Sequence, residues 1–166
     1  MYILSKQRNE DVTRAFDRYR QYLQLKRNVF PRSAFAVATS DWYFDHRRSE
    51  CPHDGWLESV SISEPSTGKR HEVRAVEINI ELLGAWHDGN IRYRYMNVQR
   101  YVFEGFSIIK GHGDWLFDEF RVNATGSLIH EIEWERGRWL VEAEDVDFSW
   151  HPFNDERRRK DSMEIA

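Results

Sequence analysis

Histidines and acids stand close together at two places in the second half of the chain. His112 lies two residues before Asp114, and His130 is followed directly by Glu131. Imidazole and carboxylate groups are common zinc ligands and common general acids and bases. Together with Asp118, these residues support one hypothesis, a metal-assisted enzyme or a small-ligand site. Neither spacing matches an established metal-binding signature, so this hypothesis is the alternative rather than the leading one.

A second chemical cluster is the segment HRRSECPHD, residues 46–54. It contains two histidines, two acids and Cys51, which is the single cysteine of the chain. A zinc site would need a second pair of ligands at suitable spacing, and no other cysteine can supply one. A nucleophilic role for Cys51 has no support beyond the nearby histidines. We therefore predict no resident cofactor and no disulfide.

Acids also line up on one face of a predicted hairpin formed by residues 127–135 and 138–150. If Arg136 and Gly137 form a two-residue turn, Trp134 pairs with Trp139 on one face and Glu131 pairs with Glu142 on the other. A four-residue loop at 123–126 then adds Asp118 beside Glu131. The predicted acidic row consists of Asp118, Glu131, Glu133, Glu142 and Glu144.

Like charges directly opposite one another destabilise a sheet, so this row needs a compensating charge. One interpretation is a solvated face with Arg92, Arg94 or Arg121 nearby. The other is a surface that binds something basic, and it is the basis of the leading hypothesis. That hypothesis is a non-catalytic binding protein whose acidic strand face engages a basic partner protein.

The distribution of charge along the chain is uneven. Residues 1–34 contain eight bases and three acids, whereas residues 112–151 contain three bases and ten acids. Either the two halves attract each other within the fold, or each faces a partner of opposite sign. A pI near 6.0 and aromatic residues committed to a helical apolar stripe disfavour nucleic-acid binding.

The elements that position these residues begin with a helix. Asn9 is a suitable N-cap, and Pro31 follows the expected end near Asn28. Apolar side chains recur at helical spacing over residues 9–28, which predicts an amphipathic helix whose apolar stripe contains Val12, Ala15, Phe16, Tyr19, Tyr22 and Leu23. The segment 33–40 is compatible with a helical turn capped by Ser33 or with a short strand.

The apolar period changes to two from residue 54 to residue 150, which predicts strands. A turn at Asp88 and Gly89 would pair Trp86 with Ile91 and place Leu82 on the same apolar face. We interpret GHGDWLFDEF, residues 111–120, as a glycine turn leading into a central strand over 115–122. The expected fold is α+β and mainly β, with the helix packed on a strongly twisted antiparallel sheet of about seven or eight strands, either a barrel or a sandwich.

Length and composition suit one globular domain over residues 1–152, followed by a polar tail, 153–166. No apolar run approaches the ~18 residues that a membrane span needs. The apolar patch in the first ten residues, MYILSKQRNE, is too short for the apolar region of a signal peptide. The single cysteine suits a reducing compartment. We therefore expect a cytoplasmic protein without a membrane partner. The seven tryptophans make a homodimer a further expectation.

Four phrases carry a resemblance to a known type of protein: HDGWLES, ELLGAWHDGNIRYRY, GHGDWLFDEF and HEIEWERGRWLVEAED, all within residues 53–147. In these the chain resembles a family of small bacterial β-rich proteins of unassigned function. In style it is also similar to the immunity proteins of bacterial polymorphic toxin systems. That resemblance implies a single-domain bacterial protein with an acidic partner-facing side, and it assigns no individual residue.

Overall fold

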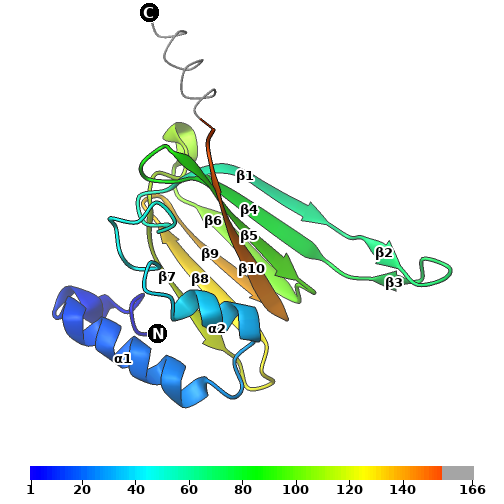
Figure 1. Cartoon of the computed structure of the whole chain (residues 1–166), viewed down its shortest axis with the longest axis horizontal. Coiled ribbons are helices and arrows are strands. Elements are labelled where there is room, and N and C mark those ends of the chain that lie inside the picture. The colour runs from blue at the N-terminus through cyan, green and yellow to red at the C-terminus, as the bar shows by residue number, and fades with distance from the viewer. Residues whose placement is uncertain (155–166) are drawn as a thin grey trace, which may run out of the picture.

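Two four-stranded antiparallel sheets lie face to face, and two helices lie along one side of them (Figure 1). The computed structural model describes residues 1–154, so most of the predicted tail lies outside the described residues. Sheet I has the strand order β1 (Trp56–Ser63), β4 (Glu77–Leu83), β5 (Gly89–Met96) and β10 (Asp145–Pro152). Sheet II has the order β6 (Arg100–Gly105), β9 (Gly137–Ala143), β8 (Leu128–Trp134) and β7 (Trp115–Val122). A short ribbon of β2 (Ser66–Thr67) and β3 (Val73–Arg74) extends the β1–β4 hairpin away from the sheets (Figure 1).

The prediction of a mainly β protein with antiparallel strands is confirmed. Within residues 1–154 the strands form separate sheets rather than a closed barrel, and each large sheet keeps two edge strands. Eight strands of six to eight residues agree with the expected number, and β2 and β3 are additional. The remaining described elements are two 3-10 turns, η1 (Lys6–Asn9) and η2 (Ile108–Lys110), and the helices α1 (Val12–Lys26) and α2 (Arg32–Ala38).

The two sheets are connected at a corner, where β5 continues into β6 and β9 continues into β10. β5 pairs with β10 in sheet I, and their direct neighbours in sequence, β6 and β9, pair in sheet II. At the corner Asn97 has a φ of 50°, a left-handed conformation that asparagine tolerates better than most residues. The corner brings the inner faces of the sheets together, and the Tyr93 and Trp115 rings stack with centroids 5.5 Å apart.

The core lies between these inner faces. Strand residues alternate between buried and partly exposed positions, as the period of two predicted. The fully buried residues from sheet I are Ile78, Ile80, Leu82, Ile91, Tyr93, Tyr95 and Val146. Their counterparts from sheet II, all at most 2% exposed, include Leu128, His130, Ile132, Trp134, Trp139, Val141 and Ala143.

The pairing register in the β4–β5 hairpin differs from the prediction. Residues 84–88 form the connection, and Gly84 accepts from His87 and donates to the Gly89 carbonyl. Leu82 therefore pairs with Ile91. Because the register shifts by an even number of residues, the apolar face is the predicted one. Trp86, expected on that face, lies in the loop and is 60% exposed.

Helix α1 begins later than predicted, because Asp11 rather than Asn9 is its N-cap. The Asp11 carboxylate accepts from the Arg14 amide at 2.9 Å. Burial of Ala15, Tyr19 and Leu23 confirms most of the predicted apolar stripe, but Val12, its first member, is 51% exposed. α1 runs beside β7, which is an edge strand of sheet II and not the predicted central one. There the Tyr19 hydroxyl accepts from the Phe120 amide at 2.7 Å and donates to its carbonyl at 3.0 Å. α1 thus covers an edge of sheet II, which protects it from pairing with other strands.

The segment 33–40, for which the sequence allowed either a helical turn or a short strand, lies mostly in helix α2. Its N-cap position is Pro31, not Ser33, and no side chain of its own caps it. Instead, the Asp145 carboxylate at the start of β10 accepts from the amides of Ser33 and Ala34 at 3.1 and 2.9 Å. A carboxylate at this position satisfies free helix amides and suits the helix dipole. Neither helix in the described part of the chain is long and apolar enough to cross a membrane.

Candidate functional site

The predicted acidic row lies on the outer face of sheet II, but its pairing differs from the prediction. The β8–β9 turn is centred on Glu135 and Arg136, one position earlier than expected, so Trp134 pairs with Gly137. Glu131 therefore lies opposite Leu140, and Glu133 lies opposite Arg138. The predicted Glu131–Glu142 pair does not form. Because the turn lies one residue earlier than predicted, no two acids lie opposite each other between β8 and β9.

Arginines neutralise the central part of this row. The Glu131 carboxylate forms ion pairs with Arg121 and, at 2.7 Å, with Arg138. Glu133 accepts from Arg8 at 2.9 Å, and the Arg8 guanidinium also lies 4.0 Å from the centre of the Phe117 ring. The contact between Arg8 and Glu133 joins the basic N-terminal part of the chain to the acidic C-terminal part. Attraction between the two halves within the fold was one of the two interpretations of the uneven charge.

Glu142 and Glu144, at the other end of the row, have neutral hydrogen-bond partners. Asn123 donates its side-chain amide to Glu142 at 2.5 Å, and the Asn97 side-chain amide donates to Glu144. Glu144 is exposed and Glu142 is half-buried. Amide donors do not cancel a carboxylate charge, and neither carboxylate forms an ion pair within residues 1–154, although Arg100 lies opposite Glu142 on β6.

Asp118, the fifth predicted member, points to the opposite side of sheet II. The β7–β8 connection contains five residues, 123–127, rather than four, so Glu131 pairs with Glu119 and Asp118 pairs with Ile132. A register shift of one residue exchanges the two faces of a strand. The prediction that Asp118 lies beside Glu131 is therefore wrong, and Asp118 is 2% exposed in the core.

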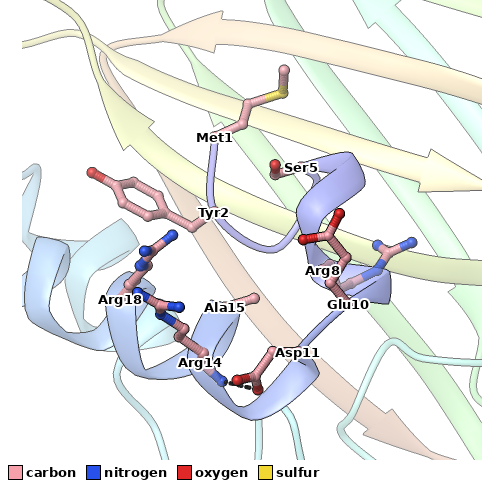
Figure 2. Close-up of a pocket in the computed structure, with 9 residues that line it drawn as sticks. All are labelled: Met1, Tyr2, Ser5, Arg8, Glu10, Asp11, Arg14, Ala15 and Arg18. Carbon is pink, nitrogen blue, oxygen red and sulfur yellow. Dashed lines mark hydrogen bonds between the residues drawn. The ribbon is translucent and has the colours of Figure 1, made fainter.

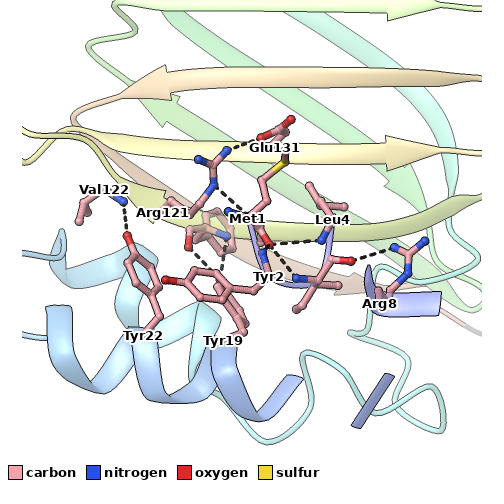
Figure 3. Close-up of polar contacts among 12 residues, drawn as sticks. Met1, Tyr2, Leu4, Arg8, Tyr19, Tyr22, Arg121, Val122 and Glu131 are labelled. Atoms are coloured by element: carbon pink, nitrogen blue, oxygen red, sulfur yellow. Dashed lines mark hydrogen bonds and ion pairs between the residues drawn. The ribbon is translucent and has the colours of Figure 1, made fainter. Parts of the chain in front are cut away.

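Glu119 takes the place on the outer face that Asp118 was expected to occupy, and the start of the chain covers it. Its side chain is 0% exposed, and one carboxylate oxygen accepts from the backbone amides of Tyr2, Ile3 and Leu4 at 2.8, 2.9 and 3.3 Å (Figure 3). The other oxygen lies 3.0 Å from the Arg121 guanidinium. Successive backbone amides that converge in this way form an anion-binding nest.

Asp118 is the centre of a buried polar network between the sheets. Its carboxylate accepts from the Tyr43 hydroxyl, from Trp115 Nε1 at 3.0 Å and from His130 Nε2 at 2.8 Å. The other ring nitrogen of His130, Nδ1, lies 2.7 Å from the Tyr95 hydroxyl. A neutral His130 with its proton on Nε2 donates to Asp118 and accepts from Tyr95, which satisfies both ring nitrogens.

The network is a chain of proton donors and acceptors in the order Tyr95, His130, Asp118. Burial raises the pKa of Tyr95 and of Tyr43 well above the ordinary value of 10.0, and the charge of Asp118 adds to both shifts. Both phenols therefore stay protonated and act as hydrogen-bond donors. Because Tyr95 comes from sheet I and the other two from sheet II, the network also fixes how the sheets meet.

The remaining members of the predicted metal cluster lie elsewhere. His112 packs against Trp134 and Trp139 with centroid distances of 5.7 and 5.1 Å, and burial lowers its pKa below 6.5. Asp114 accepts from Trp56 Nε1 at 2.8 Å. The structure thus brings Asp118 and His130 together, but not His112, Asp114 or Glu131. Among residues 1–154, no three His, Cys, Asp or Glu side chains are placed to hold a metal ion.

The two histidines of the HRRSECPHD segment meet on the surface above the buried network. The rings of His46 and His53 lie 4.6 Å apart, and His53 Nδ1 donates to the Leu116 carbonyl at 2.5 Å. Both line an open pocket of about 380 Å³ between α1, the 44–53 loop and β7, with walls from Val12, Thr13, Phe16, Arg20, Phe44 and Phe117. A deeper cavity of about 20 Å³ shares five of these residues and reaches Asp118.

Cys51, from the same segment, is not part of this pocket. Its thiol is buried and donates to the Tyr43 carbonyl at 3.2 Å. Burial raises the pKa of Cys51 from 9.0 to about 11. A thiol that stays protonated at neutral pH is a poor nucleophile, so its position suits a structural role.

A separate pocket of about 470 Å³ lies between the start of the chain and α1. Figure 2 shows Arg14 and Arg18 of α1 side by side on one flank of this pocket, with Arg8 and Glu10 on the other. Arg8 already forms an ion pair with Glu133. The basic residues of the N-terminal region are therefore divided between an ion pair inside the fold and an exposed rim.

Comparison with known proteins supplies no relative. No family model, no curated protein and no solved structure matches this chain. The functional argument accordingly rests on the geometry described above.

Proposed function

We propose that this chain is a non-catalytic binding protein, and that the outer face of sheet II engages a basic partner protein. The observation that supports the proposal is the difference along the acidic row. Guanidinium groups hold Glu131 and Glu133, whereas neutral amides hold Glu142 and Glu144. A cationic side chain from a partner can approach the latter two without displacing an arginine of this chain. Asp118 belongs to the core and is not part of the proposed surface.

A toxin-neutralising immunity protein in the bacterial cytoplasm is the form of this function that the resemblance implies. Charged interfaces act mainly by accelerating association and by selecting the partner. The rim of the interface would then consist of Glu131, Glu133 and the arginines paired with them. On binding, these glutamates would exchange their own arginines for basic side chains of the partner. Glu142 and Glu144 would make the new contacts.

The test is affinity capture from an extract of the source cells, with mass spectrometry of the retained proteins. The wild type is compared with the double variant Glu142→Lys/Glu144→Lys and with a control of equal charge change, Glu10→Lys/Asp17→Lys, on exposed acids at the helix side. We expect one basic protein to be retained by the wild type and the control and lost from the double variant. Equal capture by all three proteins, or none by the wild type, would contradict the proposal.

Small-ligand binding is a second candidate, favoured by the pocket beside α1. His46, His53 and Arg20 surround an aromatic wall, and the cavity behind them reaches Asp118. The volume of about 380 Å³ lies within the usual range of about 300–1,000 Å³ for ligand pockets. Aromatic walls with bases at the rim suit a small aromatic anion.

Calorimetric titration with naphthalene-2-carboxylate, and with its uncharged amide as the matched compound, tests this candidate. We expect the acid to bind with one-to-one stoichiometry and more tightly than the amide, and Arg20→Gln to weaken it. Arg18→Gln, on the other side of α1, is the control. Equal affinity for acid and amide, or no heat from either, would argue against an anion site.

A further inference from the structure

We infer that the side of the sandwich formed by β1 and β6 is an interface between two copies of this chain. The inference is independent of the partner proposed above. At the opposite side, α1, α2 and the 39–55 segment cover the sheets, whereas β1 lies on the side away from the helices (Figure 1). We call the β1 and β6 side the open side.

Core-facing residues of β1 are exposed although they belong to the inner face of sheet I. Val60 pairs with Ile80 and Ile62 with Ile78, and these two β4 partners are 0% exposed. Val60 and Ile62 are 38% and 46% exposed. The apolar face therefore continues past the point at which the second sheet covers it.

β6 shows the same property at the edge of sheet II. Tyr101 pairs with Val141, which is fully buried, yet the Tyr101 side chain is 45% exposed. β3, β6 and the segment that follows β6 contribute further exposed apolar residues, namely Val73, Val102, Phe106, Ile108 and Ile109. Monomeric proteins seldom expose apolar side chains in this concentration.

Both strands also have a free edge. Within residues 1–154, β1 pairs with β4 and otherwise meets sheet II only through the bridge between Trp56 and Asp114, and β6 pairs only with β9. An edge strand of six to eight residues with apolar side chains is a template for pairing with another chain. The opposite edge of sheet II, on β7, is covered by α1.

Charge and size indicate a second copy as the occupant. The β1 segment 56–64 contains Glu58 and Glu64 and no base, whereas the segment 99–110 contains Arg100 and Lys110 with a single acid. A twofold axis places β1 of each copy against β6 of the other, so the acidic edge faces the basic one twice. The segments 56–64 and 99–110 together are comparable with the roughly 20–30 residues per side of a standard interface.

Sedimentation or light scattering over the micromolar to millimolar range tests this inference. We expect the wild type to approach twice the 20.0 kDa mass of the chain as its concentration rises. Ile62→Glu and, as a second variant, Val60→Glu should raise the dimer dissociation constant by at least about tenfold. Leu25→Glu is the matched control, because Leu25 of α1 is 85% exposed and lies on another surface.

The outcomes separate clearly. Dimer formation that both β1 variants weaken and Leu25→Glu does not would support the interface, with circular dichroism showing that each variant is folded. A monomer at every concentration would overturn the inference, as would a dimer unaffected by either β1 variant. Because Glu144 lies outside β1 and β6, the single variant Glu144→Lys should dimerise like the wild type, which distinguishes this surface from the proposed partner site.

Discussion

Replacement of Glu119 by glutamine tests whether its buried carboxylate holds the start of the chain on sheet II. The substitution keeps the shape of the side chain and removes its charge. Two of the three amide bonds, from Tyr2 and Ile3, are 2.8 and 2.9 Å long. Hydrogen bonds to a charged group contribute about 1.5–3 kcal/mol and those between neutral groups about 0.5–1.5 kcal/mol, so each of these two bonds should lose about 1 kcal/mol.

A second loss comes from Arg121, which would face the new amide donor instead of a carboxylate oxygen at 3.0 Å. Arg121 keeps its ion pair with Glu131, which limits this loss. Removing a buried charge also removes its desolvation cost. We therefore expect Glu119→Gln to lower the free energy of unfolding by about 2–3 kcal/mol, and the midpoint temperature by roughly 4–12 °C for a chain of this size.

Chemical denaturation and calorimetry measure these changes, and Glu10→Gln, on an exposed acid before α1, is the control. Hydrogen exchange supplies a local readout, because the amides of Tyr2, Ile3 and Leu4 should lose protection before those of the strands. A change within 0.5 kcal/mol of the control, about the range of ordinary surface substitutions, would refute the reasoning. It would mean that the N-terminal contact contributes little to the folded state.

Three further predictions concern buried groups. Tyr95→Phe leaves His130 Nδ1 without its donor and should lower the free energy of unfolding by about 1–3 kcal/mol, which urea denaturation measures; no change would mean that water replaces the hydroxyl. Cys51 should react with a thiol reagent at pH 8 only in denaturant, and stability should fall from pH 9 upwards, because the unfolded thiol loses its proton before the folded one, whose pKa is about 11. The pKa of His112 is lowered in the fold, so its contribution to stability is present above pH 6.5 and declines as the pH falls below it. Denaturation of His112→Gln at several pH values should therefore show less loss at acidic pH than the wild type, and equal slopes would contradict this.

The faces of the strands follow from sequence, but their registers do not. Alternation of apolar and polar residues predicts that Trp134 and Trp139 point to the core, because this depends only on the period of two. The register depends on which residues form each turn, and one residue separates the expected and observed turns at Glu135. The shifted turn between β8 and β9 changed only which residues are paired. The connection between β7 and β8 is one residue longer than predicted, which exchanged the two faces of β7 and moved Asp118 from the predicted surface into the core.

The contacts of Glu119 were beyond prediction for a different reason. Its partners, Tyr2 to Leu4, are more than 110 residues away and donate through their backbone amides, which carry no residue-specific signal in the sequence. The Asp118, His130 and Tyr95 network joins two sheets in the same way. The alternation that places Trp134 on the core side also places His130 there, four residues earlier, and both are buried.

The placement of the helices has a consequence for synthesis on the ribosome. α1 and α2 are made first, yet Tyr19 bonds to Phe120 and Ser33 to Asp145, which follow 101 and 112 residues later. At translation rates of about 5–20 residues per second, these partners emerge roughly 5–20 s after the helices. During that interval the apolar face of this basic helix has nearby residues such as Phe44 to pack against, but neither sheet. Nascent chains of this protein should therefore depend on a holding factor, or on slow helix docking as the last event of folding.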